Sequence, residues 1–260
     1  MMDVITSKDN SKVKYLASLH DARTARREGV VFVEGVRSCE DALGCGVVPT
    51  VVVADEAHAD WAKKISEETG CDALLLNDVC FKKISQTVHP QGVALVAKRP
   101  EMSGEITLRG DNKDIFMCLE DIQDPGNLGT MIRIADAFDF GALLITKKTA
   151  DPFNDKVIRA SMGSIWRVRI IECEDADEMI GLLHDKGVKV LAAELHGDEL
   201  SKAPITLPAA YFIGNEGAGL KAETIASSDI KIKIPMQGKA ESLNAASAAS
   251  IIGFVLQELR

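Results

Sequence analysis

The sequence lacks a long apolar run and a leader segment at its start. None of its 260 residues falls in an apolar stretch approaching the roughly 20 residues that span a bilayer. The first residues also lack the basic start, apolar stretch and small-residue cleavage site of a secretory signal. These absences argue against secretion and membrane insertion. We therefore expect a cytoplasmic protein with no membrane partner.

The cysteines are not arranged for metal or redox chemistry. The six cysteines form no C-x-x-C pair and have no His pair nearby, so the sequence suggests neither a zinc site nor a redox motif. We expect reduced thiols, as is usual in the cytosol, and no metal.

A net positive charge is also missing, since the chain carries a net charge of −9. This acidic balance is not typical of a nucleic-acid-binding protein. One stretch differs, because Lys8 to Arg27 contains six basic residues and two acidic ones. A local cationic patch can contact phosphates despite an acidic whole. A solvated helix face explains the same charges equally well.

The first third of the chain alternates between helical and extended patterns. We expect helices over Lys12–Arg27, Gly35–Leu43 and Ala59–Thr69, and strands over Val30–Val33, Thr50–Ala54 and Ala73–Leu76. The alternation predicts a small α/β sandwich for residues 1–97.

Residues 98–113 are charged, contain proline and glycine and show little periodicity, so they are predicted to form a linker. Residues 114–260 are predicted to form a second domain. Its expected strands are Ile115–Leu119, Ala142–Thr146, Arg167–Ile171, Lys189–Ala193, Ala210–Ile213 and Ile230–Ile234. Helical patterns separate most of them, which predicts a mostly parallel sheet with helices on both faces.

Three polar loops of the second domain each follow a predicted strand and open a helix. The first is D-P-G-N-L-G-T-M-I-R, from Asp124 to Arg133. We expect Asp124 to Gly126 to form a turn and Asn127 to cap the helix, with Arg133 in the second helical turn. A capped helix with a surface arginine fits the same residues.

The second loop is F-I-G-N-E-G-A-G-L, from Phe212 to Leu220. Its glycines allow close backbone approach, and Glu216 supplies a carboxylate. Gly217, Gly219 and Ala222 also match the dinucleotide pattern G-x-G-x-x-A. The next strand has no acidic residue at its end to hold a ribose, which weakens a nicotinamide-dependent oxidoreductase.

The third loop lies in I-P-M-Q-G-K-A-E-S-L-N-A-A-S, from Ile234 to Ser247. Here Ser242 and Asn244 flank Leu243 just before an Ala/Ser-rich helix. A cap by Ser242 accounts for part of this pattern. All three loops should meet at one edge of the parallel sheet, which favours a shared site.

The three loops, in this order and spacing, resemble the SpoU (TrmH-like) family of RNA ribose 2′-O-methyltransferases in the SPOUT superfamily. The resemblance covers about Ile115 to Arg260. Residues 1–97, with S-K-D-N-S-K-V-K-Y-L and F-V-E-G-V-R, resemble the L30e-like substrate-binding domain found in many rRNA-modifying members.

The resemblance implies S-adenosylmethionine as methyl donor, held in a C-terminal trefoil knot, and a homodimer. It implies that Gly214, Ile234, Met236 and Leu243 bind the donor. It assigns catalysis to Arg133, Asn127, Glu216, Ser242 and Asn244. Because guanidinium is effectively always protonated, we expect Arg133 to orient the nucleotide and stabilise negative charge rather than act as a base.

The first domain is expected to bind RNA. Candidate phosphate contacts are Lys8, Lys12, Lys14, Arg23, Arg26, Arg27 and Arg37. The two-domain layout favours large-subunit rRNA as substrate. A catalytically silent RNA-binding paralogue acting in ribosome assembly is the alternative, although such a protein would be free to lose the catalytic set.

Overall fold

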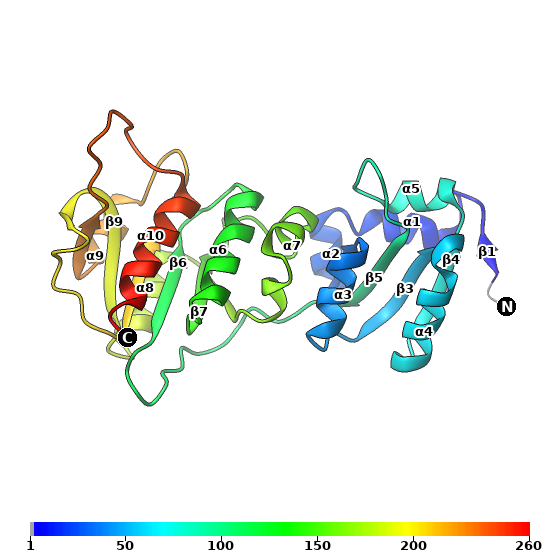
Figure 1. The fold of residues 1–260 in the computed structure, drawn as a ribbon, viewed down its shortest axis with the longest axis horizontal. Helices are drawn as coiled ribbons and strands as arrows, with labels where there is room; N and C mark the ends of the chain where they lie inside the picture. Colours follow the sequence, from blue (N-terminus) through cyan, green and yellow to red (C-terminus); the bar gives the residue numbers. More distant parts are fainter. Residues whose placement is uncertain (1–2) are drawn as a thin grey trace. The chain divides into compact units, whose positions relative to one another are not determined.

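The computed structural model describes residues 3–260 and divides into two compact units. Unit 1 contains the chain up to Pro100 together with Phe153–Trp166. Unit 2 contains Glu101–Pro152 and Arg167–Arg260. Figure 1 follows the chain through both units. Within the described residues no helix is long and apolar enough to cross a membrane.

Unit 1 is built on a five-stranded sheet in the order β1-β4-β3-β5-β2. Strand β5 runs antiparallel to both of its neighbours, while β1, β4 and β3 are parallel to one another. Its strands are β1 (Val4–Ile5), β2 (Val30–Glu34), β3 (Pro49–Asp55), β4 (Asp72–Leu76) and β5 (Val93–Lys98). Its helices are α1 (Ser11–Ser18), α2 (Ala22–Glu28), α3 (Val36–Gly44), α4 (Ala59–Thr69), α5 (Asp78–Ile84) and α7 (Asp155–Ser161).

The expected single helix over Lys12–Arg27 is two helices in the structure. The side chain of Asp21 accepts a hydrogen bond from the backbone N–H of Thr24 at 3.0 Å, which caps the start of α2. An aspartate at this position favours a new helix start over continuation. The helix α1 contributes Val13 and Leu16 to the core of unit 1.

The segment Phe153–Trp166 packs with unit 1, although the predicted domain ranges placed it within residues 114–260. Helix α7 contacts β2. Arg99 lies over the ring of Phe153 at 4.6 Å, and Val157 and Ile158 are buried. Burial of these apolar side chains therefore holds Phe153–Trp166 in unit 1. The order of the sequence alone does not predict that this segment packs with the earlier domain.

Unit 2 contains a six-stranded sheet in the order β11-β9-β10-β6-β7-β8. Every pairing in it is parallel. The strands are β6 (Ile115–Leu119), β7 (Ala142–Thr146), β8 (Ile170–Cys173), β9 (Lys189–Glu199), β10 (Ala209–Ile213) and β11 (Ile230–Lys233). The helices are α6 (Pro125–Ala137), α8 (Ala176–His184), α9 (Ala222–Ser227) and α10 (Ala245–Gln257). This confirms the predicted mostly parallel sheet.

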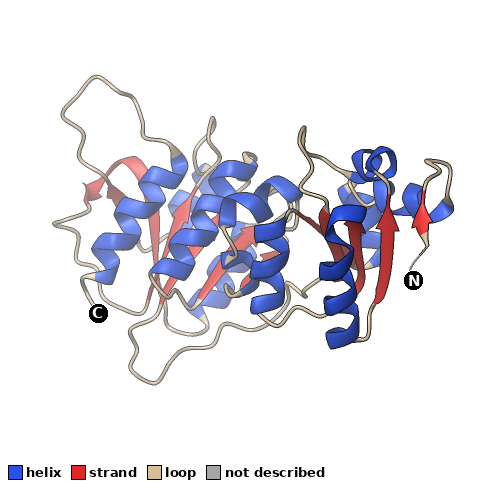
Figure 2. Cartoon of the chain, turned by 45° about the vertical axis from the view of Figure 1, so that its right-hand side comes forward, coloured by secondary structure: helices blue, strands red, loops and turns tan. Residues whose placement is uncertain are grey.

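Helices cover both faces of this sheet, as predicted (Figures 1 and 2). Helices α6 and α10 pack on each other and on the central strands β6, β7 and β10. Helix α8 packs beside β8 and β9 and contacts α9. The phenol of Tyr211 on β10 is fully buried and donates a hydrogen bond to the carbonyl of Ala249 on α10 at 3.0 Å. Apolar burial and the hydrogen bond of this buried hydroxyl hold the C-terminal helix α10 against the sheet.

The predicted linker, residues 98–113, is in part packed structure. Strand β5 reaches Lys98. The carbonyl of Met102 accepts a hydrogen bond from the N–H of Glu172 at 2.8 Å, and Ile106 lies in the core of unit 2. Because the segment is rich in charged residues, its sequence did not predict these two contacts with unit 2.

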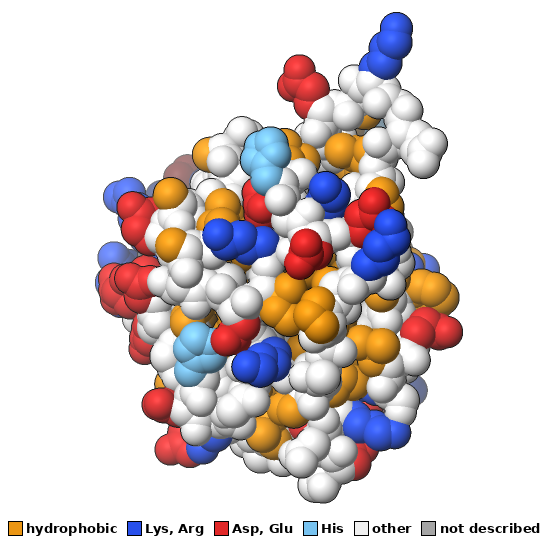
Figure 3. All heavy atoms as spheres, turned by 90° about the vertical axis from the view of Figure 1, so that its left-hand side faces the viewer, with side chains coloured by type: hydrophobic (Ala, Val, Ile, Leu, Met, Phe, Trp, Pro, Cys, Tyr) orange, Lys and Arg blue, Asp and Glu red, His pale blue; other side chains and the backbone are white. Residues whose placement is uncertain are grey.

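The loop from β11 to α10 extends well away from the sheet (Figures 1 and 2). It forms the projection at the top of Figure 3, where basic, acidic and apolar side chains are interspersed. This loop carries most of the third sequence block.

Candidate active site

The three polar loops meet at the carboxyl edge of the unit 2 sheet. The side-chain amide of Asn127 donates a hydrogen bond to Glu216 Oε1 at 3.1 Å. The amide of Asn244 donates to Asn127 Oδ1 at 2.9 Å. Residues separated by 89 and 117 positions are thereby joined into one chain of hydrogen bonds. We call Asn127, Glu216 and Asn244 the amide–carboxylate cluster.

Asn127 is available for this cluster because it does not cap α6. The cap is Asp124, whose Oδ1 accepts from the N–H of Asn127 at 2.8 Å. Pro125 occupies the first helical position, where its missing N–H costs nothing. The prediction that Asn127 caps the helix was wrong. The proline sets the start of the helix one position after Asp124, and the Asn127 side chain is left free to point at Glu216.

Glu216 is held by three donors on the first loop. Besides Asn127, the backbone N–H groups of Gln123 and Asp124 donate to its carboxylate at 3.1 and 3.0 Å. Burial opposes ionisation of Glu216, but these three hydrogen bonds outweigh it and lower the pKa of its carboxyl below the usual value. Glu216 is therefore a carboxylate at neutral pH and acts as an acceptor.

Asn244 has two functions in the structure. Its Oδ1 caps α10 by accepting from the N–H groups of Ala246 and Ser247 at 2.9 and 3.2 Å. Its amide nitrogen donates to Asn127. The cap that Ser242 could have supplied is thus made by Asn244. Ser242 lies on the exposed loop before α10 and is not joined to the cluster by any hydrogen bond within residues 3–260.

Arg133 lies on α6 and is exposed. It lies six positions after Asn127 along the helix, which amounts to roughly 9 Å along the axis. Among the residues that the structure describes, Arg133 makes no hydrogen bond or ion pair. Its guanidinium is thus free to bind an anionic or polar group from outside the chain.

The turn after β10 is closed by backbone contacts. An added Cβ on Gly214 would lie 2.2 Å from the backbone of Gly219 and Leu220. Asn215 supports the turn by accepting from the N–H groups of Gly217 and Ala218, each at 3.0 Å. Only glycine fits at position 214, because any side chain would collide with the returning backbone.

The other residues predicted to bind the cofactor lie on or beside the loop that follows β11. Ile234 directly follows β11 and is half-buried, while Met236 and Leu243 are 36% and 38% exposed. Exposed methionine and leucine side chains suit a flat apolar ligand ring. The chemistry of this set therefore fits the adenosyl group of the expected donor.

The predicted RNA contacts lie on unit 1, and all are exposed. Lys8 precedes α1, and Arg37 lies in the first turn of α3. The other five lie on α1 and α2: Lys12, Lys14, Arg23, Arg26 and Arg27. Lys14 forms an ion pair with Asp9 at 2.9 Å, and Arg27 with Glu28 at 3.2 Å. Exposed pairs of this kind are weak and can exchange for phosphate.

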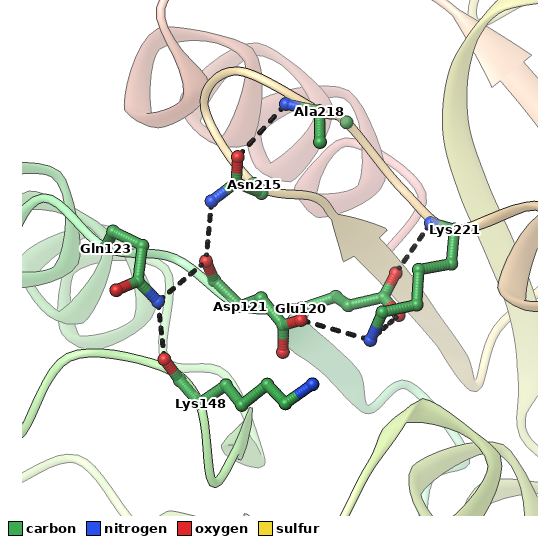
Figure 4. A pocket seen from close by; sticks show the side chains of 8 residues that line it. Glu120, Asp121, Gln123, Lys148, Asn215, Ala218 and Lys221 are labelled. Carbon is green, nitrogen blue, oxygen red and sulfur yellow. Dashed lines mark hydrogen bonds and ion pairs between the residues drawn. The ribbon is translucent and has the colours of Figure 1, made fainter.

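Sequence reasoning missed a second polar network beside the cluster (Figure 4). Glu120 and Asp121 directly follow β6, and Lys221 Nζ lies 3.1 Å from a carboxylate oxygen of each. Lys148 follows β7 and lines the same cavity. The acidic pair at the end of a predicted strand was the available signal, since that edge carries the other site residues.

Comparison with protein families gives a decisive match to the second half of the chain. The model of the SpoU rRNA Methylase family matches residues 114–254, more than half of the chain. The chain belongs to the SpoU rRNA methylase family. The model of the MRM3-like substrate binding domain matches residues 10–95. SpoU membership overturns the dinucleotide-binding interpretation of the glycines that follow β10.

Relatives with a named activity match nearly the whole chain. The 23S rRNA (guanosine(2553)-2′-O)-methyltransferase RlmP of Bacillus subtilis (strain 168) is 33% identical, covering 98% of this chain and 100% of its own length. The 23S rRNA (uridine(2479)-2′-O)-methyltransferase of Streptomyces viridochromogenes is 26% identical and covers 95% of this chain and 89% of its own. The crystal structure of the AdoMet-bound rRNA methyltransferase from Sinorhizobium meliloti aligns with a TM-score of 0.87 at 27% identity. The alignment covers 99% of this chain and 98% of the Sinorhizobium meliloti chain.

Proposed function

We propose that this SpoU protein transfers a methyl group from S-adenosylmethionine to a ribose 2′-hydroxyl of large-subunit rRNA. Family membership and the full-length likeness to two 23S rRNA 2′-O-methyltransferases support the reaction and the RNA class. The AdoMet-bound neighbour supports the donor. An rRNA substrate implies a cytoplasmic enzyme.

The observation that carries the proposal is the amide–carboxylate cluster. When bound, the donor supplies an electrophilic methyl carbon on a sulfonium, from which a neutral thioether leaves. No charge has to be neutralised on that leaving group, so the chain must chiefly align the ribose and help its hydroxyl lose a proton. Polar groups fixed by mutual hydrogen bonds at the loop junction are suited to that alignment.

We assign donor binding to Gly214, Ile234, Met236 and Leu243. The close backbone approach at Gly214 shapes the turn after β10, and the three apolar side chains suit the adenosine. A trefoil knot is proposed for the same loops. It is consistent with a chain that leaves β11 at one edge of the sheet and returns through α10 to pack on β6 and β10.

We assign Arg133 to the acceptor RNA, because its guanidinium is exposed and has no partner among residues 3–260. It would hold the nucleotide through phosphate or ribose and stabilise negative charge developing on the 2′-oxygen. Ser242 is proposed to join the site through its exposed loop. Unit 1, with its seven exposed basic residues, is proposed to supply RNA affinity.

A homodimer is proposed through α10. Ile251 and Phe254 are 39% and 54% exposed and lie three positions apart, on one face of the helix. The ring of Phe138 lies 6.5 Å from that of Phe254 and extends the apolar surface to the end of α6. A second copy packed on this surface would cover these apolar side chains.

The test is a map of ribose 2′-O-methylation in rRNA and tRNA from a strain that lacks the gene. One site in 23S rRNA should disappear and return with the wild-type gene, but not with the Asn244→Asp variant, which retains the helix cap. Loss of a tRNA site with all rRNA sites intact would contradict the rRNA substrate. Tight binding to 23S rRNA without methyl transfer by the purified protein would instead support the silent paralogue.

A further inference from the structure

A lysine joins two loops beside the amide–carboxylate cluster (Figure 4). Lys221 ends the turn that follows β10, while Glu120 and Asp121 directly follow β6. Lys221 Nζ lies 3.1 Å from Glu120 Oε1 and 3.1 Å from Asp121 Oδ2. All three residues line a cavity that Lys148 also borders. We call Lys221, Glu120 and Asp121 the lysine bridge.

Glu120 is the buried end of the lysine bridge, with 1% of its side chain exposed. Its Oε2 accepts from the backbone N–H of Lys221 at 3.1 Å, and its Oε1 accepts from Thr224 Oγ1 at 3.0 Å. The Lys221 ammonium supplies the opposite charge. Because a buried carboxylate that loses its cation is strongly unfavourable, Glu120 holds both the backbone and the side chain of Lys221 in place.

Asp121 is the second end of the lysine bridge and is itself fixed on two sides. Its Oδ1 accepts from Thr146 Oγ1 at 2.7 Å, and its backbone N–H donates to the same hydroxyl at 2.9 Å. The amide of Asn215, near the start of the turn after β10, donates to the carbonyl of Asp121 at 2.9 Å. Asp121 therefore contacts that turn near its start and at its end.

The lysine bridge holds the end of a turn that folds back on its own start. The backbone of Gly219 and Leu220 lies so close to Gly214 that an added Cβ would be 2.2 Å from it. Lys221 is the next residue, so the bridge fixes the chain directly after this close approach. A displaced Lys221 would allow Gly219 and Leu220 to move away from Gly214.

A separate set of hydrogen bonds fixes the middle of the same turn. Glu216 accepts from Asn127 and from the backbone N–H groups of Gln123 and Asp124. Lys221 takes no part in these bonds. Loss of the lysine bridge should therefore leave the amide–carboxylate cluster in place and loosen the chain that packs against Gly214.

A charged bridge is not needed for stability alone. Replacing a buried ion pair by apolar residues of similar volume is often neutral or stabilising, whereas removing one partner is costly. What the bridge adds is a fixed position for one residue. Here that residue adjoins the backbone that packs against Gly214, which we assigned to the methyl donor.

We propose that Lys221 is a positioning residue for the methyl donor, because its bridge to Glu120 and Asp121 keeps the turn after β10 closed against Gly214. This inference rests on the proposed methyl transfer and on donor binding at Gly214. A turn that is closed only part of the time binds its ligand more weakly, in proportion to the closed fraction.

Lys221→Met should raise the Kd for S-adenosylmethionine roughly tenfold in calorimetry. The Kd for a 23S rRNA fragment should not change, and kcat at saturating donor should stay within about threefold of wild type because Glu216 keeps its own donors. Lys221→Arg can still bridge two carboxylates, so its Kd for S-adenosylmethionine should lie within about threefold of wild type.

A double variant separates positioning from stability. Lys221→Met alone leaves Glu120 buried without its cation and should lower the Tm by roughly 3–10 °C. Adding Glu120→Gln removes that charge, and the amide can still accept from the N–H at position 221 and donate to Thr224 Oγ1. The Tm should then return to within about 2 °C of wild type, while the Kd for S-adenosylmethionine stays at least about fivefold higher. If Lys221→Met does not fold, the double variant carries the comparison.

The matched control is Lys189→Met. Lys189 lies at the start of β9, is 53% exposed against 46% for Lys221, and has its Nζ 3.8 Å from Asp229 Oδ1. This variant should bind S-adenosylmethionine as the wild type does. Unchanged affinity in Lys221→Met, an equal loss in Lys189→Met, or recovery of both Tm and Kd in the double variant would overturn the positioning role alone. A wild-type protein that does not bind S-adenosylmethionine would overturn the proposed function as well.

Discussion

Single side chains in the proposed active site serve the fold and the site together. Asn244 caps α10 through its oxygen and reaches Asn127 through its nitrogen. Glu216, in the turn after β10, accepts from three donors on the first loop and so helps to hold the two loops together. Substitutions that keep the shape and change one atom can separate these roles.

Asn244→Asp and Asn244→Ala should have different effects on stability and the same effect on catalysis. Aspartate keeps the cap, so its free energy of unfolding should stay within a few tenths of a kcal/mol of wild type, while alanine loses about 1 kcal/mol. Both lose the donor to Asn127, and we expect kcat to fall at least about tenfold in each. Urea unfolding and single-turnover methyl transfer measure the two effects. Full activity in the aspartate variant would contradict a role for the donated hydrogen bond.

Glu216→Gln should reveal the lowered pKa of Glu216 in the dependence of stability on pH. A carboxyl whose folded pKa lies below its unfolded value, about 4.3, stabilises the protein above that value and loses this contribution as pH falls through the folded pKa. The difference in unfolding free energy between wild type and variant should be constant from about pH 5.5 to 7.5 and shrink below about pH 4. Urea titrations across this range measure it. A difference that varies near pH 6 would contradict the assignment.

At the scale of elements, the proposed active site depends on turns that follow parallel strands. The turn after β10 folds back so closely that Gly219 and Leu220 lie against Gly214. The turn after β6 enters α6 through Asp124 and Pro125, which aims Asn127 at Glu216.

Gly214→Ala should open the turn after β10. Its Cβ would lie 2.2 Å from backbone that cannot move independently, so we expect a loss of about 1–3 kcal/mol in the free energy of unfolding and weaker binding of S-adenosylmethionine. Gly217→Ala is the control, because its nearest neighbour is Asn215 Oδ1 at an ordinary 3.7 Å. Thermal unfolding and calorimetry compare the two. Similar losses in both variants would show that the close approach at Gly214 is not the cause.

At the scale of the whole molecule, the proposed dimer depends on the apolar face of α10. Phe254→Asp places a charge on that face and should convert a dimer into a monomer in sedimentation equilibrium. Val88→Asp is the control, because Val88 is 87% exposed on unit 1. A wild-type protein that is monomeric at micromolar concentration would falsify the dimer.

The proposed RNA affinity of unit 1 should appear in the salt dependence of binding. Lys12→Gln and Arg23→Gln should each reduce the slope of log K against log salt by about one unit or less. Lys63→Gln is the control, since Lys63 lies on α4 and pairs with Glu67 at 3.8 Å. Filter binding of 23S rRNA at several salt concentrations gives the slopes. Equal slopes for all four proteins would place the RNA contacts elsewhere.

Local sequence determined much of this protein. Apolar runs such as Ile115–Leu119 and Ala142–Thr146 predicted buried parallel strands with correct limits, because a strand covered on both faces needs continuous apolar residues. The polar blocks after the strands also indicated the site, since parallel strands bring their carboxyl ends to one edge. The family resemblance rested on the same blocks.

Only the tertiary structure decided which atoms meet. The pairing of Asn127 with Glu216, the return of Phe153–Trp166 to unit 1 and the pocket between Asp121 and Lys148 join positions far apart in the chain. Periodicity and capping preferences describe neighbours within a few residues. Contacts between distant loops depend on strand order. They also depend on which side-chain donors and acceptors are already used in hydrogen bonds within their own turns.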